Sequence, residues 1–173
     1  MVKSGKLWNY FSTLAPALKN HMAGFLGEYP VTIDGKGRLK IPTALKKQLN
    51  PAVKGRFVIN RGFEKCLVLY PFDEWEKITA SVNKLNTFKK EHRNFVRIFN
   101  RGATELAIDG ADRILLPKHL LDFAGIKADA LLASRNTVIE VWHPRTYDAQ
   151  MRVDSDKFAG LAERVMGGQD LSL

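Results

Sequence analysis

The sequence predicts an α+β fold, rich in β-structure, in which two tandem swapped-hairpin repeats form one pseudo-symmetric barrel with connecting helices. The first observation is a duplicated signature: DGKGRLKIPTAL begins at Asp34, and DGADRILLPKHL begins 75 residues later at Asp109. The second is that short segments with strand and helix patterns follow each signature in the same order. The third is size, because about 45 residues are too few to bury a sound core alone. Hairpins interleaved between the copies would provide the shared core.

The first repeat, residues 28–75, is predicted as strand, turn, strand, short helix and two further strands. Its first strand, 28–33, leads into a turn at Asp34. The next four residues, RLKI, alternate basic with apolar, so Arg38 and Lys40 face the solvent over a buried pair. The later elements are a helix over 43–49 after Pro42, strands at 56–60 and 66–70, and a helix from Pro71 that is anchored by Trp75.

A helical connector, residues 76–102, joins the repeats. Its second helix, about Phe88 to Asn100, carries an apolar stripe that we interpret as core or subunit contact: Phe88, Phe95, Val96 and Phe99. The second repeat, residues 103–147, has strands at 104–108, 114–116, 130–134 and 137–142, with a turn at 109–113 and a helix from Pro117. Residues 148–173 are predicted to be a C-terminal helix and tail.

Residues 1–23 are predicted to be a flexible N-terminal extension. The first 21 residues carry three lysines and no acid, but Pro16 and polar residues interrupt any apolar segment, which argues against a secretory signal. Three interpretations stay open: a flexible arm, residues upstream of a start at Met22, or residues added in cloning.

The composition excludes several classes of function. No apolar run approaches the roughly 18 residues that span a bilayer. The single cysteine, Cys66, rules out an intrachain disulfide, favours a reducing compartment and fits a buried strand better than a reactive site. None of the four histidines has metal-binding spacing with this cysteine, and neither a Ser-His-Asp order nor a phosphate-binding glycine loop is evident. We therefore expect no enzyme activity, metal or cofactor.

The charge is concentrated in the first half of the chain. The net charge is +9, of which residues 22–100 contribute +8 and residues 101–173 contribute −2. Between positions 34 and 65, nine Lys or Arg face two acids. Such a field attracts polyanions, although a merely solvated basic surface would have the same composition.

The first signature provides the best candidates for contact with nucleic acid. Arg38 can grip guanine O6 and N7 with its planar fork, whereas lysines mainly neutralise phosphate. Asp34 is expected to hold the turn and orient Arg38. The other candidates are Lys36 and Lys40 in and after the turn, and Lys46, Lys47, Arg56 and Arg61 as secondary phosphate contacts.

The second signature, with Asp109 and Arg113, is predicted to be a weaker site. Asp112 replaces the glycine before its arginine, and an acid beside the arginine would repel phosphate. An alternative for both copies is that each Asp–Arg pair only braces its own turn.

At these residues the chain resembles a known family. The pattern Asp-x-x-Gly-Arg-x-x-Ile-Pro, ending at Pro42, resembles the swapped-hairpin DNA-binding domains of AbrB and SpoVT regulators. Two such domains joined by a helical connector resemble the MraZ family. Flanking strings agree: FLGEY at 25–29, LYP at 69–71 and GATE at 102–105. The resemblance covers about residues 24–150.

The resemblance implies a cytoplasmic, nucleoid-associated transcriptional regulator of the division and cell-wall gene cluster, usually a repressor. It implies ring-shaped homo-oligomers that bind direct repeats in promoter double-stranded DNA, with no membrane and no small-molecule substrate. An alternative of another class is an antitoxin-like interaction module of the same fold. A toxin gene next door would favour that alternative, whereas neighbouring wall-synthesis genes would favour the regulator.

Overall fold

A computed structural model describes residues 24–167. The strands are β1 (Glu28–Thr32), β2 (Arg38–Lys40), β3 (Arg56–Arg61), β4 (Leu67–Pro71), β5 (Thr104–Ala107), β6 (Arg113–Leu115), β7 (Asp129–Arg135) and β8 (Val138–Trp142). The helices are α2 (Thr43–Lys46), α3 (Phe72–Val82), α4 (Lys90–Phe99), α5 (Lys118–Ala124), α6 (Pro144–Met151) and α7 (Ser155–Met166), with a 3-10 turn η1 at Pro51–Val53. The predicted extension at 1–23 and the end of the predicted tail, 168–173, lie outside the described residues.

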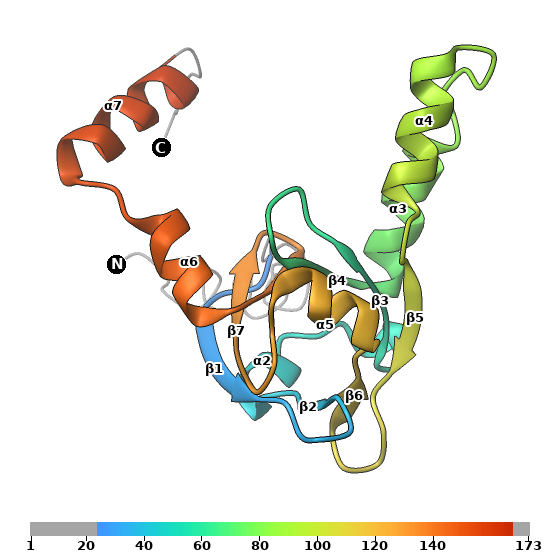
Figure 1. Ribbon diagram of the computed structural model, residues 1–173, viewed down its shortest axis with the longest axis vertical. Helices are drawn as coiled ribbons and strands as arrows, with labels where there is room; N and C mark the ends of the chain where they lie inside the picture. Colours follow the sequence, from blue (N-terminus) through green and yellow to red (C-terminus); the bar gives the residue numbers. More distant parts are fainter. Residues whose placement is uncertain (1–23, 168–173) are drawn as a thin grey trace, which may run out of the picture.

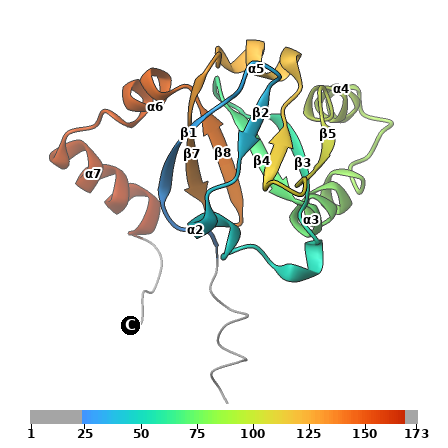
Figure 2. The ribbon, with the colours of Figure 1, turned by 90° about the horizontal axis from the view of Figure 1, so that it is seen from below.

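The two repeats exchange strands, as the interleaved-hairpin prediction requires. A six-stranded antiparallel sheet has the order β1-β7-β8-β4-β3-β5, and β2 pairs with β6 in a separate two-stranded ribbon. The first strand of each repeat therefore pairs with a strand of the other repeat. Figures 1 and 2 show the ribbon lying across one side of the sheet.

The repeats are related by a pseudo-two-fold axis. Exchanging the first repeat for the second leaves the strand order of both sheets unchanged. The central pair of the ribbon is Leu39 opposite Ile114, and the central pair of the large sheet is Val68 opposite Glu140. These pairs join residues 75 and 72 positions apart, which are the two offsets of the duplicated sequence.

The large sheet is open, which corrects the expectation of a closed barrel. Its edge strands β1 and β5 each have one neighbour. Only an isolated bridge between Ile33 and Leu39 links the large sheet to the ribbon within the described part of the chain. The ribbon strands are three residues long because Pro42 and Pro117, which follow after one intervening residue, begin the turn into helices α2 and α5. Strands this short cannot extend their pairing to both sheet edges.

The core lies between the large sheet and the ribbon. Leu39 and Ile114 point inward from the ribbon and are almost fully buried. They join Phe57 and Ile139 from the sheet and Leu120 from α5 in one apolar cluster. This is the alternation predicted for the RLKI segment, with the basic side chains of β2 on the outside.

A helical arm of α3 and α4 projects from the side of the molecule away from the ribbon (Figure 1). The ring of Trp75 stacks on Phe99 at 5.5 Å and meets Tyr70 edge-on at 5.3 Å, which anchors both helices on β4. Phe95 stacks on Phe99 in turn. Phe88 departs from the predicted stripe because it precedes the helix and is almost fully exposed.

Helix α6 follows β8, and α7 extends beyond it on the other flank of the molecule (Figure 2). The hydroxyl of Tyr147 in α6 donates a hydrogen bond to Glu28 in β1, and its ring meets Trp142 edge-on. None of the helices found in residues 24–167 is long and apolar enough to cross a membrane.

Candidate nucleic-acid interface

The first signature forms a turn braced by one carboxylate. Oδ1 of Asp34 accepts hydrogen bonds from the backbone N–H groups of Lys36 and Arg38, at 2.9 and 3.0 Å. Its Oδ2 accepts a third from Nε of Arg38, at 2.7 Å. The pKa of Asp34 is lowered, chiefly by the backbone N–H of Arg38. The carboxylate thus holds both the turn and the arginine, while the two terminal guanidinium nitrogens make no hydrogen bond within the described residues.

The second signature has the same geometry. Oδ1 of Asp109 accepts from the backbone N–H groups of Ala111 and Arg113, and Oδ2 accepts from Nε of Arg113 at 3.0 Å. Asp112 adopts a φ of +59°, in the left-handed region that Gly37 occupies at +82°. The Gly-to-Asp difference therefore leaves the turn and its arginine in place.

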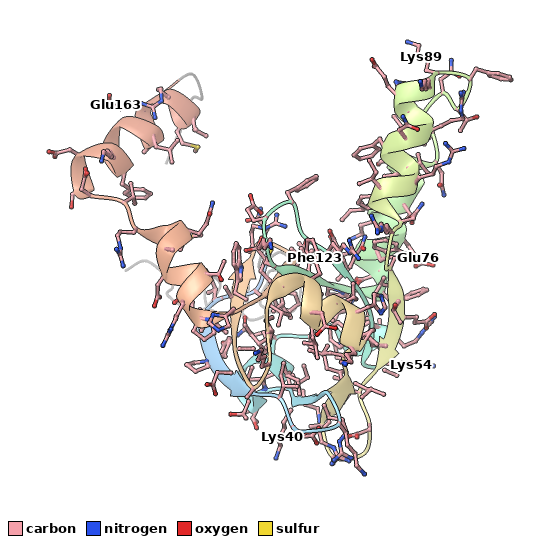
Figure 3. The ribbon with its side chains drawn as sticks, viewed as in Figure 1. Lys40, Lys54, Glu76, Lys89, Phe123 and Glu163 are labelled. Atoms are coloured by element: carbon pink, nitrogen blue, oxygen red, sulfur yellow. The ribbon has the colours of Figure 1, made fainter. Side chains whose placement is uncertain are left out.

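The ribbon brings the two signatures together on one outer face. Register places Arg38 opposite Leu115 and Lys40 opposite Arg113, while the central pair between them points into the core. Figure 3 shows Lys40 at the edge of the body farthest from the helical arm. Cations of both repeats thus share a single surface. The weaker role predicted for the second signature stays a prediction.

Like charges meet on this face. Lys40 and Arg113 are direct cross-strand neighbours, an arrangement that destabilises a sheet in the absence of a counter-charge. Asp109 binds one edge of the Arg113 guanidinium, but Lys40 and Lys36 form no ion pair in residues 24–167. An anion bound over the ribbon would relieve this repulsion.

The two lysines of α2 differ in their environment. Nζ of Lys46 forms an ion pair with Oδ1 of Asp112, 66 positions away in sequence. Lys46, a predicted phosphate contact, is exposed, but this ion pair engages its ammonium group. The pair also offsets the acid that made the second signature look unfavourable. Lys47 is exposed, with no ion pair in the described part of the chain.

Arg56 and Arg61 already have partners elsewhere. The Arg56 guanidinium pairs with Glu105 at 2.7 Å and lies 3.7 Å from the centre of the Phe72 ring. That of Arg61 lies 4.6 Å from the centre of the Phe123 ring, which Figure 3 shows on the side opposite Lys40. The structure does not bring either arginine to the ribbon.

Two other features of the described residues concern metal ligands and the single cysteine. No group of three or more His, Cys, Asp or Glu within 24–167 is placed to hold a metal ion. Cys66 is completely buried, and burial raises the pKa of its thiol to about 12. Its predicted role as a core residue agrees with this environment.

Two comparisons with known proteins fit this duplicated architecture. The family model described as "MraZ protein, putative antitoxin-like" matches residues 25–98 and, a second time, residues 99–167. The chain belongs to the MraZ family. This confirms the predicted family and the two tandem repeats.

Curated MraZ proteins match over most of the chain. A protein of Christiangramia forsetii is 43% identical over 150 residues, which cover 86% of this chain and 97% of that protein. A protein of Flavobacterium psychrophilum is 41% identical, covering 84% and 94%, and one of Moorella thermoacetica is 35% identical, covering 82% and 96%. All three are named transcriptional regulator MraZ, which agrees with the prediction that the chain is not an enzyme.

Proposed function

We propose that this MraZ-family chain is a transcriptional regulator that binds double-stranded DNA through the outer face of the β2–β6 ribbon. The observation that carries the proposal is the cross-strand pair of Lys40 and Arg113 beside Arg38, three cations on one exposed face. The names of the relatives support a role in transcription. A two-stranded ribbon also has the right width to enter the major groove of B-DNA.

In this proposal the turn residues have separate tasks. Asp34 holds Arg38 by accepting a hydrogen bond from the Nε of the arginine. The two terminal guanidinium nitrogens are then left to bind a guanine. Lys36 and Lys40 neutralise phosphates, and Arg113 adds a contact from the second repeat. Lys47 remains a secondary phosphate contact, whereas Lys46, Arg56 and Arg61 would first have to leave their present partners.

Assembly completes the proposal. One ribbon with a few cations would bind weakly, whereas a ring of copies on spaced direct repeats would gain about 10²–10⁴ in avidity. The family resemblance leads us to place these repeats in the promoter of the division and cell-wall gene cluster, where the bound ring represses transcription in the nucleoid of the cytoplasm.

The test replaces Lys40 by Gln and measures DNA binding at several salt concentrations. Loss of one phosphate contact should weaken binding to promoter and random duplexes alike, and should reduce the slope of log affinity against log salt by about 0.9. Arg38→Ala should weaken promoter binding more than random binding, because it removes a base contact.

Lys89→Gln is the matched control, because Lys89 lies at the tip of the helical arm (Figure 3). It should leave both the affinity and the salt slope unchanged. If Lys40→Gln and Arg38→Ala bind like the Lys89 variant, the ribbon is not the DNA-binding surface.

The description of the matching family model keeps the antitoxin-like alternative in view. That function requires a toxin as partner and does not require the ribbon to be basic. Stable binding of the product of a neighbouring gene, with no salt-dependent binding to promoter DNA, would favour it over the proposal.

A further inference from the structure

One apolar side chain interrupts the cationic outer face of the ribbon. The outward positions are Arg38 and Lys40 on β2, and Arg113 and Leu115 on β6. Leu115 is 57% exposed, although its neighbours Ile114 and Leu116 are buried. An exposed leucine gains nothing from phosphate, whereas contact with an apolar group of a bound ligand would remove its side chain from water.

The pseudo-two-fold axis shows what is unusual about Leu115. Exchange of the repeats superimposes Arg38 on Arg113, and Lys40 on Leu115. Leu115 is therefore the one outward position at which the two halves of the ribbon differ in chemistry. Without this difference, the outward side chains of the ribbon would look the same to DNA after the ribbon was rotated by 180° about the pseudo-two-fold axis.

Leu115 lies beside the first signature turn. It is the direct cross-strand neighbour of Arg38. Its Cδ1 atom lies 3.8 Å from the position that a Cβ atom on Gly37 would occupy. Any group that Arg38 reads in a groove would thus have Leu115 next to it.

We propose that Leu115 reads the C5-methyl group of a thymine beside the base held by Arg38. Among the four bases, thymine alone presents a methyl group in the major groove. An apolar contact from a leucine can therefore distinguish thymine from the other bases. The inference rests on the proposed DNA-binding function and adds a specificity residue to it. It also gives the ribbon a fixed orientation on DNA, as repeats that all run in one direction require.

The experiment removes single methyl groups from DNA. The duplex is the promoter region upstream of the protein's own gene, and each thymine in the bound segment is replaced in turn by deoxyuridine, which keeps the same pairing edge and lacks the methyl group. The wild-type protein should bind at least one such duplex about three- to fivefold more weakly, the value expected for one buried methyl group. Leu115→Ala should bind the thymine and uracil duplexes equally at that position.

Two further variants and one control sharpen the result. Leu115→Met should keep the discrimination, because it remains apolar. Leu115→Lys should lose the discrimination between thymine and uracil. It should also steepen the slope of log affinity against log salt by about 0.9, the value for one added phosphate contact. Ile98→Ala removes another exposed apolar side chain, on α4, and should discriminate like the wild type.

The outcomes separate this inference from the proposed function. If the wild type does not discriminate thymine from uracil anywhere, or Leu115→Ala discriminates equally well, Leu115 does not read thymine. That result would leave the salt dependence and the Lys40→Gln effect intact. Promoter binding that does not depend on Lys40 or Arg38 would instead overturn the function itself.

Discussion

Two aspartates determine the local structure of the candidate site. Asp34 and Asp109 each accept two backbone hydrogen bonds and one from an arginine Nε. Charged acceptors strengthen such bonds, and both carboxylates have lowered pKa values, chiefly through the backbone N–H of the arginine. The same carboxylates therefore position the arginines and stabilise the turns.

These pKa values predict a pH dependence of stability. A carboxyl group with a lowered pKa in the folded state stabilises the protein above its ordinary pKa, here 3.8, and loses that contribution as the pH falls through the lowered value. Asp109→Asn cannot be protonated, so its free energy of unfolding should fall less than that of the wild type between about pH 5 and about pH 3. Urea titrations at both pH values measure this difference.

Asp148→Asn is the control, because Asp148 is exposed on α6 and accepts no side-chain hydrogen bond in the described residues. It should follow the wild-type pH dependence. An Asp109→Asn protein with the same acid sensitivity as this control would contradict a stabilising role for the turn carboxylate.

At the scale of elements, the ribbon is symmetric in backbone and asymmetric in side chains. Backbone N–H groups of Ile41 and Leu116 donate to the carbonyl oxygens of Asp112 and Gly37, as equivalent bonds across the axis. Yet α2 supplies Lys46 to an ion pair with Asp112, whereas α5 presents no counterpart at Gly37. At one end of the ribbon, Asp112 is therefore neutralised by Lys46. At the other end, the turn that contains Gly37 has no such ion pair with a helix within the described residues.

Asp112→Asn should increase affinity for promoter DNA. Asparagine tolerates the left-handed conformation at this position, so the turn should persist. The substitution removes a negative charge and releases Lys46, which can then bind a phosphate and steepen the salt slope by up to about 0.9. Fluorescence anisotropy at several salt concentrations measures both quantities.

Asp156→Asn makes the same change of charge on α7, away from the ribbon. The general effect of one added net charge should appear equally in both variants, so the difference between them reports on position. Equal affinities and equal slopes would mean that the Asp112 end of the ribbon does not approach DNA.

At the scale of the whole molecule, the ribbon and the helical extensions lie on different sides (Figure 1). Helix α7 has no buried residue, and its Phe158, Leu161 and Val165 recur at helical spacing with exposed fractions of 62%, 46% and 61%. In the proposed ring, this stripe would be one surface for contact between copies, because such contact leaves the ribbon free for DNA.

Leu161→Glu should therefore reduce the mass of the assembly. Placing a charge in an apolar contact is unfavourable unless it is paired, so light scattering should report smaller particles at the same concentration. Binding to a promoter with several repeats should fall by about tenfold or more as avidity is lost, while binding to a single repeat should persist.

Gln150→Glu adds the same charge to the exposed surface of α6 and should leave the mass unchanged. A Leu161→Glu protein with the wild-type mass would exclude α7 as the contact between copies.

The sequence by itself determined the family, the duplication and the local structure of each turn. The aspartate and the arginine of a signature are four residues apart, and the alternation that buries Leu39 and exposes Lys40 spans adjacent residues. Interactions of such short range are encoded in one segment and can be predicted there. The interleaving of the hairpins followed from a repeat too short to bury its own core.

Only the tertiary structure decided which side chains meet across the repeats. The ribbon register placed Arg113 beside Lys40 and Leu115 beside Arg38, and packing joined Lys46 to Asp112. It also left the sheet open rather than closing a barrel. These contacts join residues more than 60 positions apart, and a shift of one residue in strand pairing would exchange every partner. Register is set by the packed core as a whole, so no local pattern in the sequence specifies it.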